Sequence, residues 1–153
     1  MTFFLGLEVQ QQKSGISICQ SKYIADMLVK YSLSDCKLAF TPVSKTDKLH
    51  ADPTSTDVNH SLYRGMIGSL LYLTGTQNLA LWYPRDSALK LFGYTDSDYA
   101  GCNLDKKSTS GGCHFLGNRL ISWSSKKQTS VAISTAEAEY VAAGRCCAQL
   151  LWI

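Results

Sequence analysis

Charged residues are scarce in this chain, at 18% of 153 residues, whereas about a quarter is typical of globular proteins. Disordered chains combine high charge with low hydrophobicity. The scarcity of charge, together with a hydrophobic content of 45%, therefore indicates a packed core. The length fits one ordinary domain or two small pieces of larger ones. The net charge of +3 permits contact with a polyanion but does not require it.

The chain also lacks Cys-x-x-Cys pairs and histidines at metal-ligand spacing, although it has six cysteines. We therefore expect reduced thiols in an intracellular protein rather than a structural zinc site. No apolar run approaches the roughly 20 residues that span a bilayer, and the first residues lack the basic start of a signal peptide. These absences predict a protein without membrane association.

Hydrophobic periodicity predicts strands and a helix in the first half of the chain. Ser21 is expected to cap a helix whose apolar residues, from Ile24 to Tyr31, share one buried face. A second helix should be buried on several sides, because it is apolar around most of its circumference. The predicted elements are strands at 3–9 and 16–19 around a polar turn at 10–15, the capped helix, a unit end at Thr41-Pro42, a loop at 44–60 and the second helix at 62–73.

The second half of the chain is predicted to be a strand-rich segment followed by one long helix. Gly117-Asn118 is a strong turn signal between two apolar runs and predicts a hairpin. The predicted elements are strands at 79–83 and 89–96, a turn at 106–112, the hairpin strands at 113–116 and 120–123, an exposed basic segment at 126–128 and a helix at 135–152.

Acidic residues occur at the end of one predicted strand and at the start of the last helix. Asp96 and Asp98 are two apart and share a face if the strand continues. Ser134 and Glu137 fit a capping box, which gives Glu137 a structural role. Glu137 and Glu139 flank the predicted core stripe about 200° apart, so they cannot serve one site together. Because the capping box engages Glu137, Glu139 is the better candidate ligand. That stripe is Ile133, Ala136, Tyr140, Ala143, Cys147, Leu150 and Leu151.

Four motifs, in this order, resemble the RNase H domain of copia-type LTR retrotransposon Pol polyproteins. They are GYTDSDYAG at 93–101, DKKSTSG at 105–111, ISWSSKKQ at 121–128 and STAEAEY at 134–140. Two earlier segments, FLGLEV at 4–9 and YRGMIGSLLYLT at 63–74, resemble the end of the reverse transcriptase in the same polyproteins. The resemblance covers essentially the whole chain.

The resemblance implies an α+β fold of the α/β RNase H-like kind. Residues 1–75 would be a β-hairpin and helix remnant of the reverse transcriptase, from its thumb or connection. Residues 76–153 would be the N-terminal part of an RNase H-like domain, namely a partial sheet with its first helix. Family members carry an additional segment after the stretch matching Thr74, so we expect an internal loss of several dozen residues there.

The implied family activity is magnesium-dependent hydrolysis of the RNA strand in RNA:DNA hybrids by a two-metal mechanism. Asp96 and Glu139 would be the catalytic residues and the ligands of Mg2+, with Asp98 in an outer position at most. The strand that brings the family's third aspartate and the polymerase's own Asp-Asp motif fall outside these 153 residues. We therefore expect weak Mg2+ binding and an activity that is lost or very weak.

Basic residues near the predicted hairpin suggest phosphate contact, with Trp123 and Tyr99 as stacking surfaces. The basic residues are Lys106, Lys107, Arg119, Lys126 and Lys127. This leaves two alternatives open: a non-catalytic nucleic-acid-binding remnant that uses the basic hairpin, and an interaction module unrelated to nucleic acid. A solvated basic face with core aromatics would look the same in sequence.

The resemblance also implies partners and a location. The partners would be an RNA:DNA hybrid or other nucleic acid, and the rest of the Pol polyprotein, in a cytoplasmic setting. Without the family's later strand, the strand at 89–96 would be an unpaired sheet edge. Part of the apolar face of the last helix, including Trp152, would also lose its cover. We therefore expect marginal stability and self-association through the edge.

Overall fold

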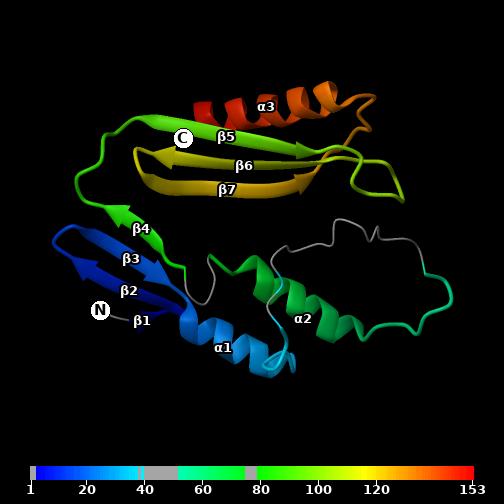
Figure 1. The fold of residues 1–153 in the computed structure, drawn as a ribbon, viewed down its shortest axis with the longest axis horizontal. Coiled ribbons are helices and arrows are strands. Elements are labelled where there is room, and N and C mark those ends of the chain that lie inside the picture. The colour runs from blue at the N-terminus through cyan, green and yellow to red at the C-terminus, as the bar shows by residue number, and fades with distance from the viewer. Residues whose placement is uncertain (1–2, 38, 40–51, 75–78) are drawn as a thin grey trace. The chain divides into compact units, whose positions relative to one another are not determined.

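The computed structural model describes residues 3–37, 39, 52–74 and 79–153, which form two antiparallel sheets and three helices. Figure 1 shows these elements along the chain. The chain divides into two compact units: unit 1 is Met1–Phe40 with Thr54–Asp86, and unit 2 is Thr41–Pro53 with Ser87–Ile153. The predicted mixed α+β class is confirmed, whereas its RNase H-like character stays a prediction.

Unit 1 contains a four-stranded sheet in the order β1-β2-β3-β4. The strands are β1 (Phe3–Phe4), β2 (Leu7–Gln12), β3 (Gly15–Cys19) and β4 (Leu81–Pro84). The predicted polar turn at 10–15 is too long, because β2 continues to Gln12, which pairs with Gly15. The three glutamines of β2 are exposed, and an exposed strand accepts polar side chains.

The first helix, α1 (Ser21–Lys30), buries the face predicted from its periodicity. Ile24 and Tyr31 are buried there. The predicted cap is wrong: Gln20 occupies the N-cap position, and no side chain caps the helix. Gln20 is fully buried instead, and its side-chain amide donates to the Tyr72 carbonyl and accepts from the backbone N–H of Thr74.

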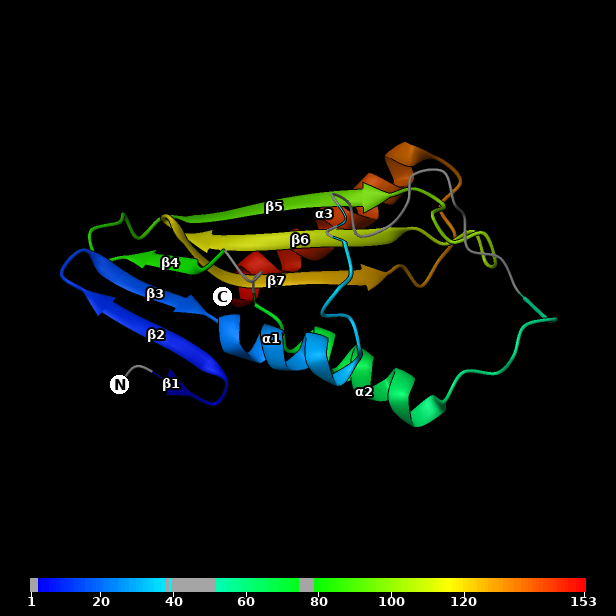
Figure 2. The same ribbon diagram turned by 60° about the horizontal axis from the view of Figure 1, so that its bottom comes forward.

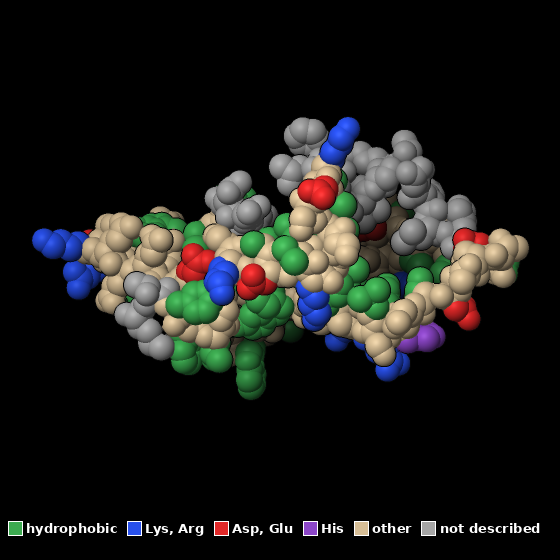
Figure 3. Space-filling model, turned by 90° about the horizontal axis from the view of Figure 1, so that it is seen from below, with side chains coloured by type: hydrophobic (Ala, Val, Ile, Leu, Met, Phe, Trp, Pro, Cys, Tyr) green, Lys and Arg blue, Asp and Glu red, His purple; other side chains and the backbone are tan. Residues whose placement is uncertain are grey.

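The second helix, α2 (His60–Leu71), begins within the predicted loop and is capped by Asn59, whose side chain accepts from the Leu62 N–H. The rest of the loop prediction falls partly on residues 44–51, which lie outside the described residues, as does the unit end predicted at Thr41-Pro42. None of the residues of α2 is buried, so the prediction of burial on several sides is wrong. Most of the large apolar side chains of α2 are exposed. Figure 3 shows exposed apolar side chains on the face of the protein that it views.

Unit 2 contains a three-stranded sheet in the order β5-β6-β7, formed by β5 (Leu91–Asp98), β6 (Thr109–Leu116) and β7 (Arg119–Lys127). The hairpin around Gly117-Asn118 is confirmed. Gly117 has φ +60°, and a Cβ there would lie 2.1 Å from the Ala88 carbonyl oxygen, so only glycine fits. The predicted turn at 106–112 is wrong in its second half, because β6 already begins at Thr109.

The third helix, α3 (Thr135–Trp152), has the predicted bounds and runs along one face of the β5–β7 sheet, as Figures 1 and 2 show. The predicted core stripe is wrong. Ala138, Ala142 and Cys146 are buried, whereas Tyr140 is 80% exposed and Leu151 is 90% exposed. Small side chains allow the helix to lie close to the sheet, so hydrophobic size alone pointed to the wrong face.

The predicted domain boundary after residue 75 falls at 75–78, outside the described residues. The strand predicted at 79–83 forms as β4, but it pairs with β3. Along the chain, one boundary between the two compact units falls between Asp86 and Ser87. A division of the chain into domains of different origin stays a prediction.

Candidate functional site

Asp96 and Asp98 lie near the end of β5 on the face of the sheet that α3 leaves uncovered, here called the open face. Exposure alternates along β5, and both carboxylates belong to the exposed set. The intervening residues face α3, since a Cβ on Gly93 would lie 2.9 Å from the Cys146 sulfur. The predicted sharing of one face by Asp96 and Asp98 is confirmed.

Glu137 forms the predicted capping box. The Ser134 hydroxyl accepts from the Glu137 N–H at 3.1 Å, and the Glu137 carboxylate accepts from the Ile133 N–H at 2.6 Å. The return bond reaches one residue further back than in the usual motif. Glu137 is thus committed to the helix start, as the sequence predicts.

Glu139 is exposed and projects toward the β5 side of α3. It is 11 residues from Leu150, which places the two side chains about 20° apart around the helix axis. Leu150 contacts β5, because a Cβ on Gly93 would lie 2.8 Å from its Cδ1 atom. The helix therefore directs Glu139 toward the strand that carries Asp96.

Gln128 brings the first turns of α3 to the end of the sheet where Asp96 lies. Its side-chain amide donates to the Ser110 hydroxyl at 3.0 Å and to the Ala138 carbonyl at 2.9 Å. Ser110 pairs with Ser97 on β5. Asp96 and Glu139 thus share one end and one edge of the sheet, with Asp96 on the open face and α3 on the other.

The sequence motif placed Gln128 in an exposed basic segment, and this prediction is wrong, since Gln128 is only 4% exposed. Its role was missed because a glutamine beside two lysines looks solvated until the helix packs over it. Within the described ranges, no group of three or more His, Cys, Asp or Glu side chains is arranged to hold a metal ion. All six cysteines are free.

The predicted basic cluster separates into two ends of the hairpin. Lys127 forms an ion pair of 2.7 Å with Asp105 in the β5–β6 loop, which also carries Lys106 and Lys107. Arg119 lies at the opposite end of β7, about 24 Å from Lys126 at the usual rise per strand residue. Its guanidinium donates to the Ser87 carbonyl. Trp123 and Tyr99 are 46% and 40% exposed, so both offer ring surface.

The Asp105–Lys127 pair changes the titration of both groups. The hydrogen bond from Lys127 is the largest cause that lowers the pKa of Asp105, to about 2. The same bond raises the pKa of Lys127. Since Asp105 offsets the charge of Lys127, this lysine offers less attraction to a phosphate than an unpaired lysine does.

A group of residues that the sequence did not single out lines a cleft between α3 and the sheet. His114 is 2% exposed, and its Nε2 lies 3.5 Å from the sulfur of Cys146. Burial is the largest cause that raises the pKa of the Cys146 thiol, so the sulfur is protonated at neutral pH. The sequence signal was weak, because alternating Ser, Gly and His residues on β6 lack the usual apolar pattern.

Comparison with known proteins gives relatives over nearly the whole chain. The chain is 30% identical to the uncharacterized mitochondrial protein AtMg00810 of Arabidopsis thaliana, over 98% of the chain and 77% of that protein. It is 29% identical to the retrovirus-related Pol polyprotein from transposon RE1 of the same plant, over 99% of the chain. It is 26% identical to the corresponding polyprotein from transposon TNT 1-94 of Nicotiana tabacum, over 97% of the chain.

The chain spans only 13% of the RE1 polyprotein and 14% of the TNT 1-94 polyprotein. The alignment with RE1 covers 187 positions against the 153 residues of the chain, so at least 34 of its positions have no counterpart here. The internal loss of several dozen residues expected after Thr74 stays a prediction, and residues 75–78 lie outside the described residues.

No family model matches the chain. No solved structure matches it. In the part of the chain that the structure describes, no helix combines the length and the hydropathy of a transmembrane span.

Proposed function

Because the chain belongs to the retrovirus-related Pol polyproteins of copia-type transposons, we propose that it is a Pol fragment in which an RNase H-like segment follows a reverse transcriptase remnant. In this proposal residues 1–75 derive from the end of the reverse transcriptase, and residues 76–153 are the N-terminal part of the RNase H domain. The family chemistry is hydrolysis of the RNA strand of an RNA:DNA hybrid, and the rest of the polyprotein is the natural partner.

One observation carries the proposal: a three-stranded antiparallel sheet followed by a helix places Asp96 and Glu139 at one end and one edge of the sheet. In a two-metal site the ions activate the attacking water and stabilise the leaving oxygen. Asp96 and Glu139 would hold Mg2+ at the β5 edge, and Asp98 would stand beside them.

The same geometry argues for a weak activity. Mg2+ requires near-octahedral oxygen ligands and often binds through one or two carboxylates plus substrate phosphates. Asp96 and α3 lie on opposite faces, so a shared ion would have to sit past the sheet edge with the hybrid supplying further ligands. Each 1.4 kcal/mol lost from transition-state stabilisation costs about tenfold in rate, so we expect cleavage several orders of magnitude below a complete site.

Magnesium-dependent cleavage of a labelled RNA:DNA hybrid by the purified chain tests the proposal. Asp96→Asn should abolish any residual cleavage, because it removes a ligand charge. Asp98→Asn is the matched control, since it changes a neighbouring carboxylate on the same face and should retain most of the activity. If Asp96→Asn cleaves as well as the parent chain, the assignment of the site is wrong.

A second candidate is a non-catalytic nucleic-acid-binding remnant. The observation that favours it is a group of four lysines at one end of the sheet. Lys106 and Lys107 lie in the β5–β6 loop with Asp105, and Lys126 and Lys127 lie at the adjoining end of β7. Hybrid binding should then weaken with salt in proportion to the phosphates contacted. Lys126→Gln should lower the slope of log K against log salt by about 1. Salt-dependent binding without cleavage would favour this candidate over the nuclease.

A further inference from the structure

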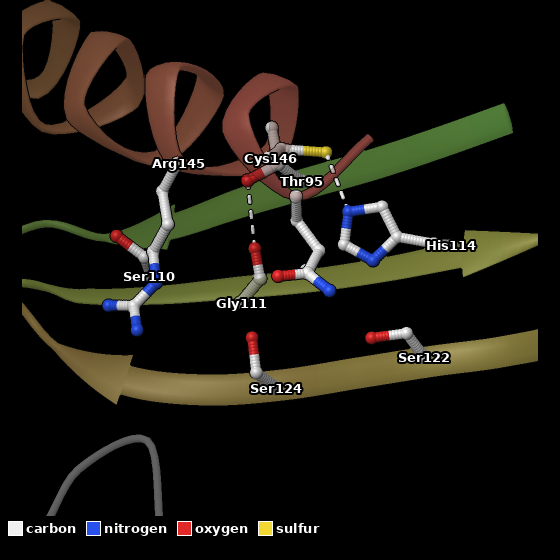
Figure 4. Close-up of a pocket in the computed structure, with 10 residues that line it drawn as sticks. Thr95, Ser110, Gly111, His114, Ser122, Ser124, Arg145 and Cys146 are labelled. Atoms are coloured by element: carbon white, nitrogen blue, oxygen red, sulfur yellow. Dashed lines mark hydrogen bonds between the residues drawn. The ribbon is translucent and has the colours of Figure 1, made fainter. Parts of the chain in front are cut away.

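A polar cleft of about 150 Å³ lies between α3 and the sheet of unit 2, on the side away from Asp96. Figure 4 shows the Arg145 side chain extending from α3 toward the sheet, and the side chains of Ser122 and Ser124 extending from β7 into the cleft. These two serines pair with His114 and Gly112 of β6, so all four residues belong to the face that α3 covers. Three elements thus direct polar groups into one space.

The donors in this cleft are unengaged. Among the described residues, neither the guanidinium of Arg145 nor the hydroxyls of Ser122 and Ser124 have a hydrogen-bond or ion-pair partner. The Nδ1 atom of His114 is also buried without a partner in the described part of the chain. Of these groups, only the His114 Nδ1 atom is both buried and unpartnered and so costs free energy. The exposed Arg145 and Ser124 and the half-buried Ser122 can donate to a group that enters the cleft.

The charge of the cleft has one sign. None of the described residues that line it is acidic, and Arg145 supplies a positive charge. Lys126 lies two residues beyond Ser124 on the same face of β7 and adds a second positive charge nearby. The cleft therefore suits an anion and repels a cation.

We propose that this cleft is a binding site for a phosphate group, held by Arg145, Ser122 and Ser124. Arginine presents parallel N–H donors that match two oxygens of an oxyanion. Two hydroxyls on the sheet side meet further oxygens of a tetrahedral group, whereas a planar carboxylate has only two oxygens to offer. The volume is well below the roughly 300 Å³ at which pockets for drug-sized ligands begin, so the bound moiety is a single small group. It is either free inorganic phosphate or the terminal phosphate of a nucleic-acid strand.

The test is a titration of the 15N-labelled full chain with inorganic phosphate at constant ionic strength, followed by the backbone amides of Ser122, Ser124 and Arg145. We expect saturable shifts confined to the cleft. Arg145→Gln should weaken phosphate binding by at least about tenfold. Arg145→Lys keeps the charge but loses the two parallel N–H donors, so its affinity should lie between those of the parent chain and Arg145→Gln. Arg64→Gln is the matched control, because Arg64 is an exposed arginine on α2. Since Arg145 is exposed as well, its variants should retain the amide spectrum of a folded chain.

A second arm uses a 5′-phosphorylated dinucleotide and separates the two sources. Saturation by inorganic phosphate alone identifies the free ion, and saturation only by the dinucleotide identifies a strand terminus; either result supports the site. Equal shifts in the parent chain and in Arg145→Gln would overturn it. So would saturation of the same amides by acetate at the same concentrations, or no response to either phosphate probe. None of these outcomes depends on hybrid cleavage, which the proposed function assigns to Asp96 on the open face.

Discussion

The Asp105 carboxylate is held in its charged form by Lys127, and this leads to a prediction about acid titration. We expect Asp105 to titrate with a pKa of about 2 instead of its usual 3.8. Because the folded pKa is depressed, the pair stabilises the fold above pH 3.8, and this contribution is lost as the pH falls toward 2. A titration of the side-chain carboxyl carbon by NMR measures the midpoint directly.

Lys127→Met should raise the Asp105 midpoint toward 3.8, because the largest cause of the depression is removed. The midpoint should stay somewhat below 3.8, since the backbone N–H of Lys107 also donates to this carboxylate. Lys106→Met is the control. Lys106 lies near Asn103 and makes no ion pair with Asp105 in the described residues, so its removal should leave the midpoint unchanged. An unchanged midpoint in Lys127→Met would contradict the assignment.

At the residue scale, sequence reasoning succeeded where the cause is local. The capping box assigned Glu137 to the helix start, because both partners lie within one turn. It failed for Gln128 and Gln20, which are buried and hydrogen-bonded to distant backbone groups. Their burial depends on which elements pack over them, and a single polar letter in the sequence does not contain that information.

At the scale of elements, the close approach of α3 to β5 predicts opposite effects for two glycine substitutions. Gly93→Ala should destabilise unit 2 by about 1–3 kcal/mol, because the new Cβ would lie 2.8 Å from Leu150 and 2.9 Å from the Cys146 sulfur. Gly144→Ala should stabilise it by up to about 1 kcal/mol, since Gly144 is helical and has nothing within 4 Å of its Cβ position. Urea unfolding of each variant measures the two free energies. A stabilised Gly93→Ala would mean that α3 lies further from β5.

The start of α3 gives a second prediction about an element. Ser134→Ala should lower the free energy of unfolding by about 1 kcal/mol, because the Glu137 N–H loses its acceptor. Ser134→Asp is the matched control, since aspartate also accepts at an N-cap and favours the positive end of the helix. Equal stability of Ser134→Ala and the parent chain, measured by urea unfolding, would show that the cap contributes nothing.

Element existence was predicted better than element position. The hairpin at Gly117-Asn118 and the bounds of α3 follow from turn and capping residues, which act locally. The buried face of α3 did not follow, because Ala138 and Ala142 are small and the large apolar Tyr140 lies outside. The contact distance to the sheet selects the face, and that distance is a property of the packed pair.

On the scale of the whole molecule, the family was predicted from motifs spread along the chain, whereas the division into two compact units was not. The sequence predicts that the strand at Leu81–Pro84 belongs to the segment 76–153, yet this strand pairs with β3 of unit 1. Strand partners far apart in sequence are chosen by register and burial, which periodicity within one strand does not determine. The assignment of Asp96 and Glu139 as ligands stays a prediction, and the face of the sheet on which each lies depends on the side that α3 covers.

The edge strand β5 predicts self-association of the whole chain. In the described residues β5 pairs only with β6, which leaves its other edge open, and Tyr94 is 61% exposed on its open face. Open edges pair with other chains unless charge or proline interrupts them. Tyr94→Lys should therefore reduce association in sedimentation experiments, because charges on adjoining edges repel. Tyr140→Lys is the matched control on α3, where the tyrosine is 80% exposed. Association that survives Tyr94→Lys but is lost in Tyr140→Lys would place the contact on the helix.

If the edge is the contact, hydrogen exchange of the amides in residues 91–98 should slow as the protein concentration rises, since pairing with a second β5 protects the outward-facing N–H groups.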